Sequence, residues 1–141
     1  MKKLFLTLGL CSALMTTATQ AENVDKALVI VNSASLQTQG MAMVLANAMQ
    51  AKGTQVDVLL CDQAGDLALK STRSSELKPR NVTPEQLMGK LQQGGAQVSV
   101  CALYLPNSQH TQNDLRAGIN VAKPPAIADQ MLDSNRRIYS F

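Results

Sequence analysis

The sequence contains no tryptophan, only two phenylalanines and two tyrosines, and a single histidine among its 141 residues. So few aromatic rings provide no platform for stacking nucleic-acid bases. The 13 basic and 10 acidic residues give a net charge of only +3. The sequence therefore lacks the clustered positive charge by which proteins bind nucleic acid, and we expect no nucleic-acid partner.

Catalytic and metal-binding motifs are also scarce. One histidine, without a nucleophile-elbow motif, is not sufficient for a Ser-His-Asp hydrolase. Asp62, Asp66 and Asp114 do not have the spacing of a known metal-ligand pattern, so we interpret them as loop and cap carboxylates. The glycine pair at 94–95 lies between a predicted helix and a predicted strand, which indicates a turn and not a phosphate cradle. We expect neither a metal nor a cofactor.

The chain has no apolar run of the roughly 20 residues that a membrane-spanning helix needs. Its first 21 residues, MKKLFLTLGLCSALMTTATQA, place Lys2 and Lys3 before a shorter apolar run from Leu4 to Met15. This layout is typical of a secretory signal peptide, cleaved after Ala21. We therefore expect a periplasmic protein that has no membrane segment after cleavage.

Cleavage would leave residues 22–141, a length that suits one domain with a single core. It would remove two of the 13 basic residues and no acidic one, so 11 basic and 10 acidic residues would remain. Two cysteines, Cys61 and Cys101, belong to this mature chain. Disulfides form and persist in exported proteins, so the state of these two thiols is the first chemical question.

The first half of the mature chain predicts a βαβ unit. Residues 26–35 are an apolar run closed by small polar residues, as in a parallel strand covered on both faces. Residues 36–53 have helical spacing and end at a glycine, and residues 54–61 predict a second strand. A polar surface segment then begins with a candidate short helix at residue 62 and extends to residue 81.

The second half continues the alternation. Thr83, Pro84 and Gln86 form a capping-box pattern that starts a short helix, and residues 96–105 predict the third strand. A polar loop, a helical turn and a short extended segment follow. The last two predicted elements are a helix over residues 123–135 and a final strand over residues 136–141. Alternating strands and helices without hairpin signals predict an α/β sandwich with a mainly parallel sheet.

Ligands of open parallel sheets bind beyond the carboxyl ends of the strands. Three polar segments are expected at that edge, one after each of the first three strands. The candidate pocket residues in them are Asn32, Ser33, Ser35, Asp62 and Asn107, and both mature cysteines belong to the same edge.

Cys101 has three interpretations: a small buried side chain, a thiolate nucleophile, or one half of a disulfide with Cys61. If the first strand lies between the other two, as in the flavodoxin-like order, the strands of the two cysteines are nearly 10 Å apart. A disulfide needs Cα atoms within about 7 Å, so the loop after Cys61 would have to fold across. Cys61 is either a core residue or a second thiol. His110, on the polar loop, is either solvated or an activating base for Cys101.

Three stretches together resemble the DsrE/DsrF-like family, which includes the sulfur-relay proteins of the TusD type. They are LANAMQAKGTQVDVLLCDQAGDLAL (45–69), LQQGGAQVSVCALYL (91–105) and IADQMLDSNRRIYSF (127–141). The most specific elements are the cysteine that closes a V-x-V-C strand and the terminal strand that ends in phenylalanine.

This resemblance implies a flavodoxin-like α/β sandwich that assembles as a trimer or hexamer. It also implies that Cys101 matches the cysteine that accepts sulfane sulfur as a persulfide from a donor protein and passes it to an acceptor. Residues 105–111 would then govern access to Cys101. Two alternatives remain open: a non-catalytic oligomer that binds a small ligand or a partner in the same crevice, and a redox role for Cys61 with Cys101.

Overall fold

The computed structural model describes residues 25–141, so the predicted signal peptide and its cleavage site lie outside the described residues. Five parallel strands form one sheet in the order β4-β3-β2-β1-β5. The strands are β1 (Lys26–Val31), β2 (Gln55–Leu60), β3 (Gln97–Val100), β4 (Ile119–Val121) and β5 (Arg136–Ser140). The α-helices are α1 (Leu36–Ala51), α2 (Pro84–Gln93) and α3 (Pro124–Leu132), and short 3₁₀ helices are η1 (Asp62–Ala68), η2 (Leu105–Asn107) and η3 (Gln112–Asp114).

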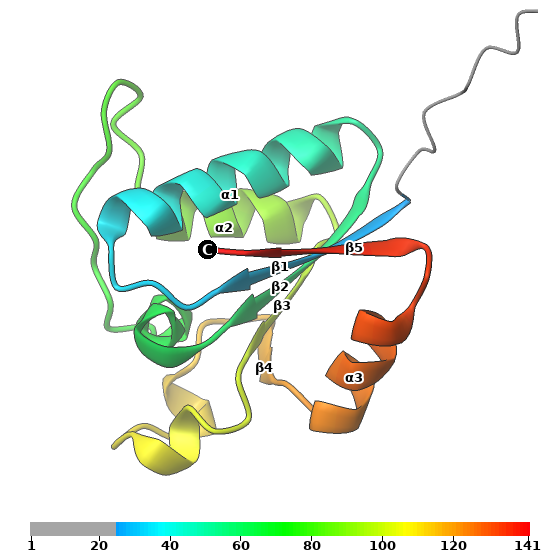
Figure 1. The fold of residues 1–141 in the computed structure, drawn as a ribbon. Helices are drawn as coiled ribbons and strands as arrows, with labels where there is room; N and C mark the ends of the chain where they lie inside the picture. The colour runs from blue at the N-terminus through cyan, green and yellow to red at the C-terminus, as the bar shows by residue number, and fades with distance from the viewer. Residues whose placement is uncertain (1–24) are drawn as a thin grey trace, which may run out of the picture.

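The sheet is covered by helices on both faces, which makes the fold a flavodoxin-like α/β sandwich. Helices α1 and α2 pack side by side on one face, and α3 lies on the other (Figure 1). The main core lies between the sheet and α1 with α2, and alternate strand residues such as Val29, Val58 and Val98 point into it. This arrangement confirms the fold class predicted from the sequence.

The α3 face has a much smaller core. Its buried cluster contains Leu28, Leu59 and Ala122, with Ile30, Cys61 and Ile127 packed against it. No residue of α3 is fully buried, and Leu132 at its end is 83% exposed. One thinly packed helix therefore leaves apolar surface on this side of the sheet. None of the helices within residues 25–141 is both long and apolar enough to cross a bilayer.

Local sequence signals account for the helix ends. Ser35 caps α1 by accepting a hydrogen bond from the Thr38 backbone N–H. The predicted capping box at α2 is present: Thr83 Oγ1 accepts from Gln86 N–H at 3.2 Å, and Gln86 Oε1 accepts from Thr83 N–H at 2.9 Å. The turn after α1 contains Gly53 at φ +90°, a backbone conformation that glycine adopts without steric strain.

The strands differ from the sequence analysis in two respects. The condition that the first strand lies between the other two is not met, because β2 sits between β1 and β3. Right-handed crossovers that place α1 and α2 on the same face move the chain in the same direction each time, so successive strands are neighbours. The third strand is also shorter than 96–105: it ends at Val100, and the chain turns so that Tyr104 N–H donates to the Cys101 carbonyl at 2.9 Å.

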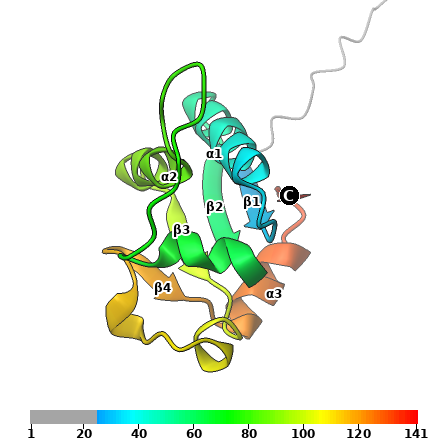
Figure 2. The same cartoon turned by 90° about the vertical axis from the view of Figure 1, so that its left-hand side faces the viewer.

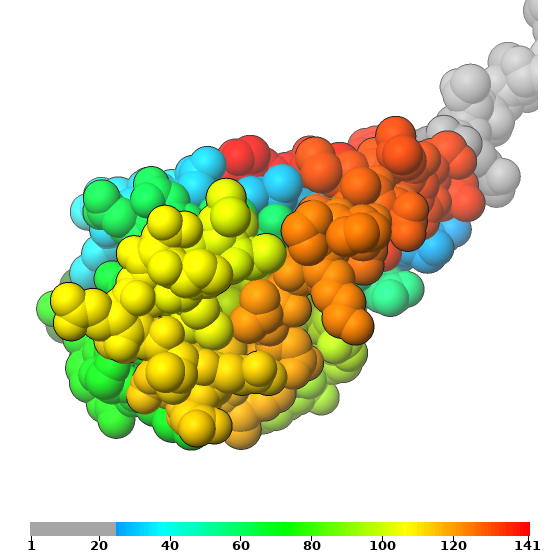
Figure 3. Space-filling view, turned by 90° about the horizontal axis from the view of Figure 1, so that it is seen from below, coloured from blue at the N-terminus to red at the C-terminus, as the bar shows by residue number. Residues whose placement is uncertain are grey.

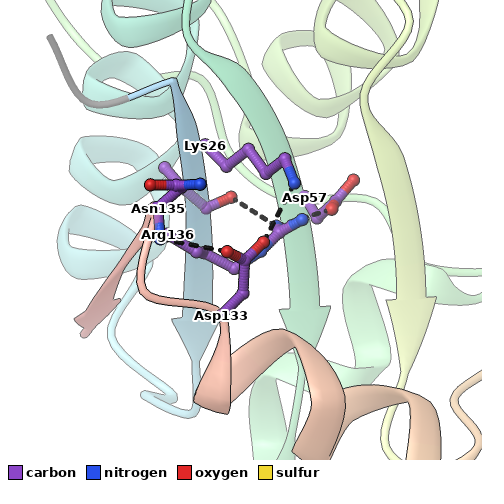
Figure 4. A network of polar contacts seen from close by, with 6 residues as sticks. Lys26, Asp57, Asp133, Asn135 and Arg136 are labelled. Atoms are coloured by element: carbon purple, nitrogen blue, oxygen red, sulfur yellow. Dashed lines mark hydrogen bonds and ion pairs between the residues drawn. The ribbon is translucent and has the colours of Figure 1, made fainter.

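A polar network ties the amino ends of three strands together on the α3 face (Figure 4). Arg136 Nη1 pairs with Asp57 Oδ2 at 2.7 Å, and both side chains are more than nine-tenths buried. Lys26 Nζ pairs with Asp133 Oδ2 at 3.0 Å in a more exposed position. Together these pairs join β5 and the end of α3 to β1 and β2.

Candidate functional site

Cys61 and Cys101 lie next to each other at the carboxyl edge of the sheet. Leu60 of β2 is opposite Val100 of β3, so Cys61 and Cys101 each come one residue after this matched pair. The backbone pairing continues there, because Cys101 N–H donates to the Leu60 carbonyl at 2.7 Å. Neighbouring strands are about 4.8 Å apart. The distance objection to a Cys61–Cys101 disulfide therefore no longer holds.

Both thiols belong to the α3 side of the sheet. Cys61 packs against the small cluster that contains Leu28 and Leu59, and both cysteines are free and half-buried. Burial is the largest cause that raises the pKa of the Cys61 thiol, and the charge on Cys101, a hydrogen bond to Cys101 and the charge of Asp62 add to it, bringing the pKa to about 12. The two thiols therefore influence each other's charge and titrate as a pair.

A pocket of about 420 Å³ opens beside this pair. Its lining residues come from η1 and from the segment after β3: Asp62, Gln63, Asp66, Cys101, Leu103, Tyr104, Asn107 and Ser108. Figure 2 looks onto this edge and shows η1 lying across the strand ends, with the segment after β3 below it. Cys101 lines the pocket, whereas Cys61 is not among the lining residues. A ligand in the pocket therefore meets the Cys101 thiol first.

Tyr104 forms one wall of the pocket. Its hydroxyl donates a hydrogen bond to Asp66 Oδ1. Burial raises the pKa of Tyr104, and the hydrogen bond to Asp66 and the charge of that carboxylate act in the same direction. The ring packs directly over Gly65, where an added Cβ would lie 2.4 Å from Tyr104 Cδ2. A glycine at this position lets the ring lie against η1.

The loop after Cys101 is held by local hydrogen bonds. Asn107 Nδ2 donates to the Leu103 carbonyl at 2.7 Å, and Ser108 Oγ donates to the Leu105 carbonyl at 3.1 Å. The space-filling view shows this yellow segment beside the orange segment that contains β4 and α3 (Figure 3). His110 is half-buried, and its backbone N–H donates to Ser108 Oγ at 3.2 Å. It is not one of the residues that line the pocket beside Cys101.

The predicted pocket residues divide into two groups. Asp62 and Asn107 lie in the pocket with Cys101, although Asn107 uses its amide to hold the loop. Ser33 and Ser35 have structural partners: Ser33 Oγ accepts from Ser35 N–H, and Ser35 Oγ caps α1. The Asn32 backbone N–H donates to the Phe141 carbonyl, which joins the end of β1 to the end of the chain. These three residues are not among those that line the pocket.

Sequence reasoning missed several lining residues, above all Gln63, Leu103 and Tyr104. A signal for Tyr104 was available, because it is one of two tyrosines and lies three residues after Cys101. Reading the third strand through to Leu105 placed Tyr104 inside a strand and concealed its role.

The chemistry of the site is that of a thiol pair. The lining residues include the carboxylates Asp62 and Asp66 and no lysine or arginine. Within residues 25–141, no group of three or more His, Cys, Asp or Glu side chains is arranged to hold a metal ion. The pair can act as a nucleophile, as a redox couple, or as both.

Comparisons with known proteins give similarity in structure and not in sequence. No family model matches the chain, and no curated protein matches it. The YchN protein from E. coli is similar in structure with a TM-score of 0.65 and 15% identity, over 83% of this chain and 99% of YchN. MTH1491, a protein of unknown function from Methanobacterium thermoautotrophicum, has a TM-score of 0.67 and 11% identity, over 82% of this chain and 98% of its own. Both neighbours have the DsrE-like fold, and the chain described above shares that fold with them.

Proposed function

We propose that this protein accepts sulfane sulfur on Cys101 as a persulfide and passes it to a thiol acceptor. The observation that supports this function is the position of Cys101: it lines a pocket at the carboxyl edge of the sheet and lies beside Cys61, which follows the neighbouring strand. The resemblance of the V-x-V-C segment to sulfur-relay proteins points to the same residue.

The proposed transfer consists of two thiol exchange steps. The Cys101 thiolate attacks the outer sulfur of a donor persulfide, R–S–SH, and the donor S–S bond breaks. The products are Cys101–S–SH and the donor thiolate, R–S⁻. An acceptor thiolate then attacks the outer sulfur of Cys101–S–SH, becomes the new persulfide, and leaves Cys101 as a thiolate. No external oxidant or reductant is needed.

Cys61 supports the first step as a hydrogen-bond partner. Its raised pKa, about 12, keeps the proton on Cys61 at neutral pH. A protonated thiol beside Cys101 stabilises the negative charge that Cys101 carries when it attacks the donor, since hydrogen bonds to ionised groups are the stronger ones.

The test is to incubate the reduced mature chain with inorganic polysulfide, alkylate it and weigh it intact. We expect Cys101 to gain one sulfur atom, the Cys101→Ser variant to gain none, and the matched Cys61→Ser variant to load. Equal loading of the Cys101→Ser variant would refute the proposal. It would favour the alternative of a ligand-binding or partner-binding protein in which Cys101 only packs.

We also propose that the protein works in the periplasm as a homo-oligomer and exchanges sulfur with a donor or acceptor protein. The signal-peptide layout of residues 1–21 supports export. Exposed Met131, Leu132 and Ile138 on the thinly covered α3 face support self-association. Native mass spectrometry of the periplasmic protein should show a trimer or hexamer that begins at Glu22, and a monomer would contradict the assembly.

A further inference from the structure

We propose that Cys61 is a resolving thiol, which attacks the Cys101 persulfide, releases hydrosulfide and closes a Cys61–Cys101 disulfide. This inference rests on the proposed function, because it begins from sulfur already bound to Cys101. It adds a second fate for that sulfur. Instead of passing to an acceptor intact, the sulfane sulfur is reduced within the protein.

The register of β2 and β3 supplies the geometry. Cys61 and Cys101 follow the matched residues Leu60 and Val100, and the hydrogen bond from Cys101 N–H to the Leu60 carbonyl holds the two backbones at strand spacing. A spacing of about 4.8 Å lies within the Cα range of about 4.4–6.8 Å that disulfides require. Residues directly opposite each other point to the same face of a sheet, so the two sulfurs are neighbours.

The pocket determines the order in which the two thiols react. Cys101 lines the pocket, whereas Cys61 is not among the lining residues and packs against the buried cluster that contains Leu28 and Leu59. An incoming persulfide therefore reaches Cys101, and Cys61 acts only on sulfur that Cys101 already holds. Cys61 also follows the strand next to that of Cys101, so its thiol lies beside the Cys101 sulfur that it would attack.

The step balances without an added oxidant. The proton of Cys61 moves to the outer sulfur of Cys101–S–S⁻, and the Cys61 thiolate formed in this way attacks the Cys101 sulfur. The bond between that outer sulfur and Cys101 breaks, and HS⁻ leaves through the pocket. The two cysteine thiols are oxidised to a disulfide, and the sulfane sulfur is reduced to sulfide.

Another round requires a dithiol reductant. One thiolate of the reductant attacks Cys101, the sulfur that faces the pocket, and forms a mixed disulfide. Its second thiol then closes the reductant's own disulfide and leaves Cys61 and Cys101 reduced. Without such a dithiol, each chain should release about one sulfide and then stop.

The experiment uses the full mature protein with inorganic polysulfide as the sulfur source. Wild type, Cys61→Ser and Cys61→Ala are loaded, freed of excess polysulfide and followed by sulfide release and intact mass. Two replacements are used because Cys61 is half-buried in an apolar cluster, where alanine keeps an apolar side chain and serine keeps a donor. Circular dichroism verifies that each variant is folded.

We expect wild type to lose its added sulfur, release about one sulfide per chain and end lighter than the reduced chain by two hydrogens. Both Cys61 variants should keep the added sulfur and release none, and dithiothreitol should restore loading of wild type. The resolving role would be overturned if wild type kept its persulfide as long as the variants, or if the variants released sulfide at the wild-type rate. Neither result would contradict the proposed function. If no protein gains sulfur, the proposed function fails as well.

Discussion

At the scale of single residues, the two cysteines should differ sharply in reactivity. The pKa of Cys61 is raised to about 12, so its thiolate forms only in strongly alkaline solution. Only the thiolate reacts with alkylating reagents. We therefore expect iodoacetamide to label Cys101 at neutral pH while Cys61 stays unlabelled, and Cys61 labelling to increase with pH up to about 12.

The Cys101→Ser variant provides the control for that pH profile. It removes the charge and the thiol that help raise the pKa of Cys61, leaving burial as the largest cause. Cys61 should then become labelled at a lower pH than in wild type. A Cys61 profile that does not move, or labelling of both cysteines at the same pH in wild type, would show that the two thiols do not interact. Peptide mapping after timed alkylation measures both outcomes.

Gly65→Ala tests the wall of the pocket. The added Cβ would lie 2.4 Å from Tyr104 Cδ2, so the ring must move away from Asp66. Overpacking of this kind costs about 1–3 kcal/mol of unfolding free energy. Because the chain has no tryptophan, its intrinsic fluorescence comes from two tyrosines, and we expect this signal to change with the variant.

The matched control is Gly89→Ala, where an added Cβ meets no atom within 4 Å. Alanine favours a helix over glycine by up to about 1 kcal/mol, so this variant of α2 should be as stable as wild type or more stable. Urea denaturation compares the two. A Gly65→Ala protein with unchanged stability and fluorescence would show that Tyr104 is not held against η1.

Single-residue signals in the sequence predicted part of the pocket lining. Cys101 and Asp62 are recognisable because each follows an apolar run directly, which places them at the strand ends. Tyr104 and Leu103 depend on where β3 stops, and an apolar run that continues past Val100 conceals this. Ser33 and Ser35 have the same polar character as the residues that line the pocket. Only their hydrogen-bond partners show that they have a structural role at the start of α1.

At the scale of the element, Thr83→Ala should weaken α2. The change removes the hydrogen bond from Gln86 N–H to Thr83 Oγ1 and leaves that N–H without its cap. Loss of an N-cap costs about 1 kcal/mol. Thr83→Ser keeps the oxygen and should remain close to wild type. Equal stabilities of the alanine and serine variants in urea would contradict a role for the cap.

The helices and strands themselves were predictable because their signals are local. The capping box at Thr83 and the glycine after α1 mark helix ends by chemistry within a few residues. Strand order has no such signal, since it depends on which face each crossover helix covers. That choice places β2 beside β3 and brings Cys61 next to Cys101, so the distance argument against a disulfide, which assumed another strand order, does not apply.

At the scale of the whole molecule, the Asp57–Arg136 ion pair joins β2 to the last strand across β1. Both side chains are buried, and removing one partner leaves an uncompensated charge that costs about 3–5 kcal/mol. We expect Asp57→Leu and Arg136→Met to destabilise the protein separately by amounts of this size. The double variant should recover most of the loss, because it buries no charge.

Urea denaturation of the four proteins completes the double-mutant cycle. A double variant that is as unstable as the sum of the single variants would show that the two charges do not interact. Within residues 25–141, Asp57 Oδ1 and Arg136 Nε have no hydrogen-bond partner. The pair is therefore incompletely satisfied, which is why an apolar replacement of both should be tolerated.

The adjacent positions of Cys61 and Cys101 also have a topological consequence. A bond between them would enclose about 40 residues in a covalent ring that contains η1, α2 and β3. Closing a ring of this size reduces the freedom of the unfolded chain and is worth about 4 kcal/mol in the chain-entropy description. The oxidised protein would then resist unfolding and proteolysis throughout this middle third. A chain that has released its sulfur would therefore survive longer than a chain that has not.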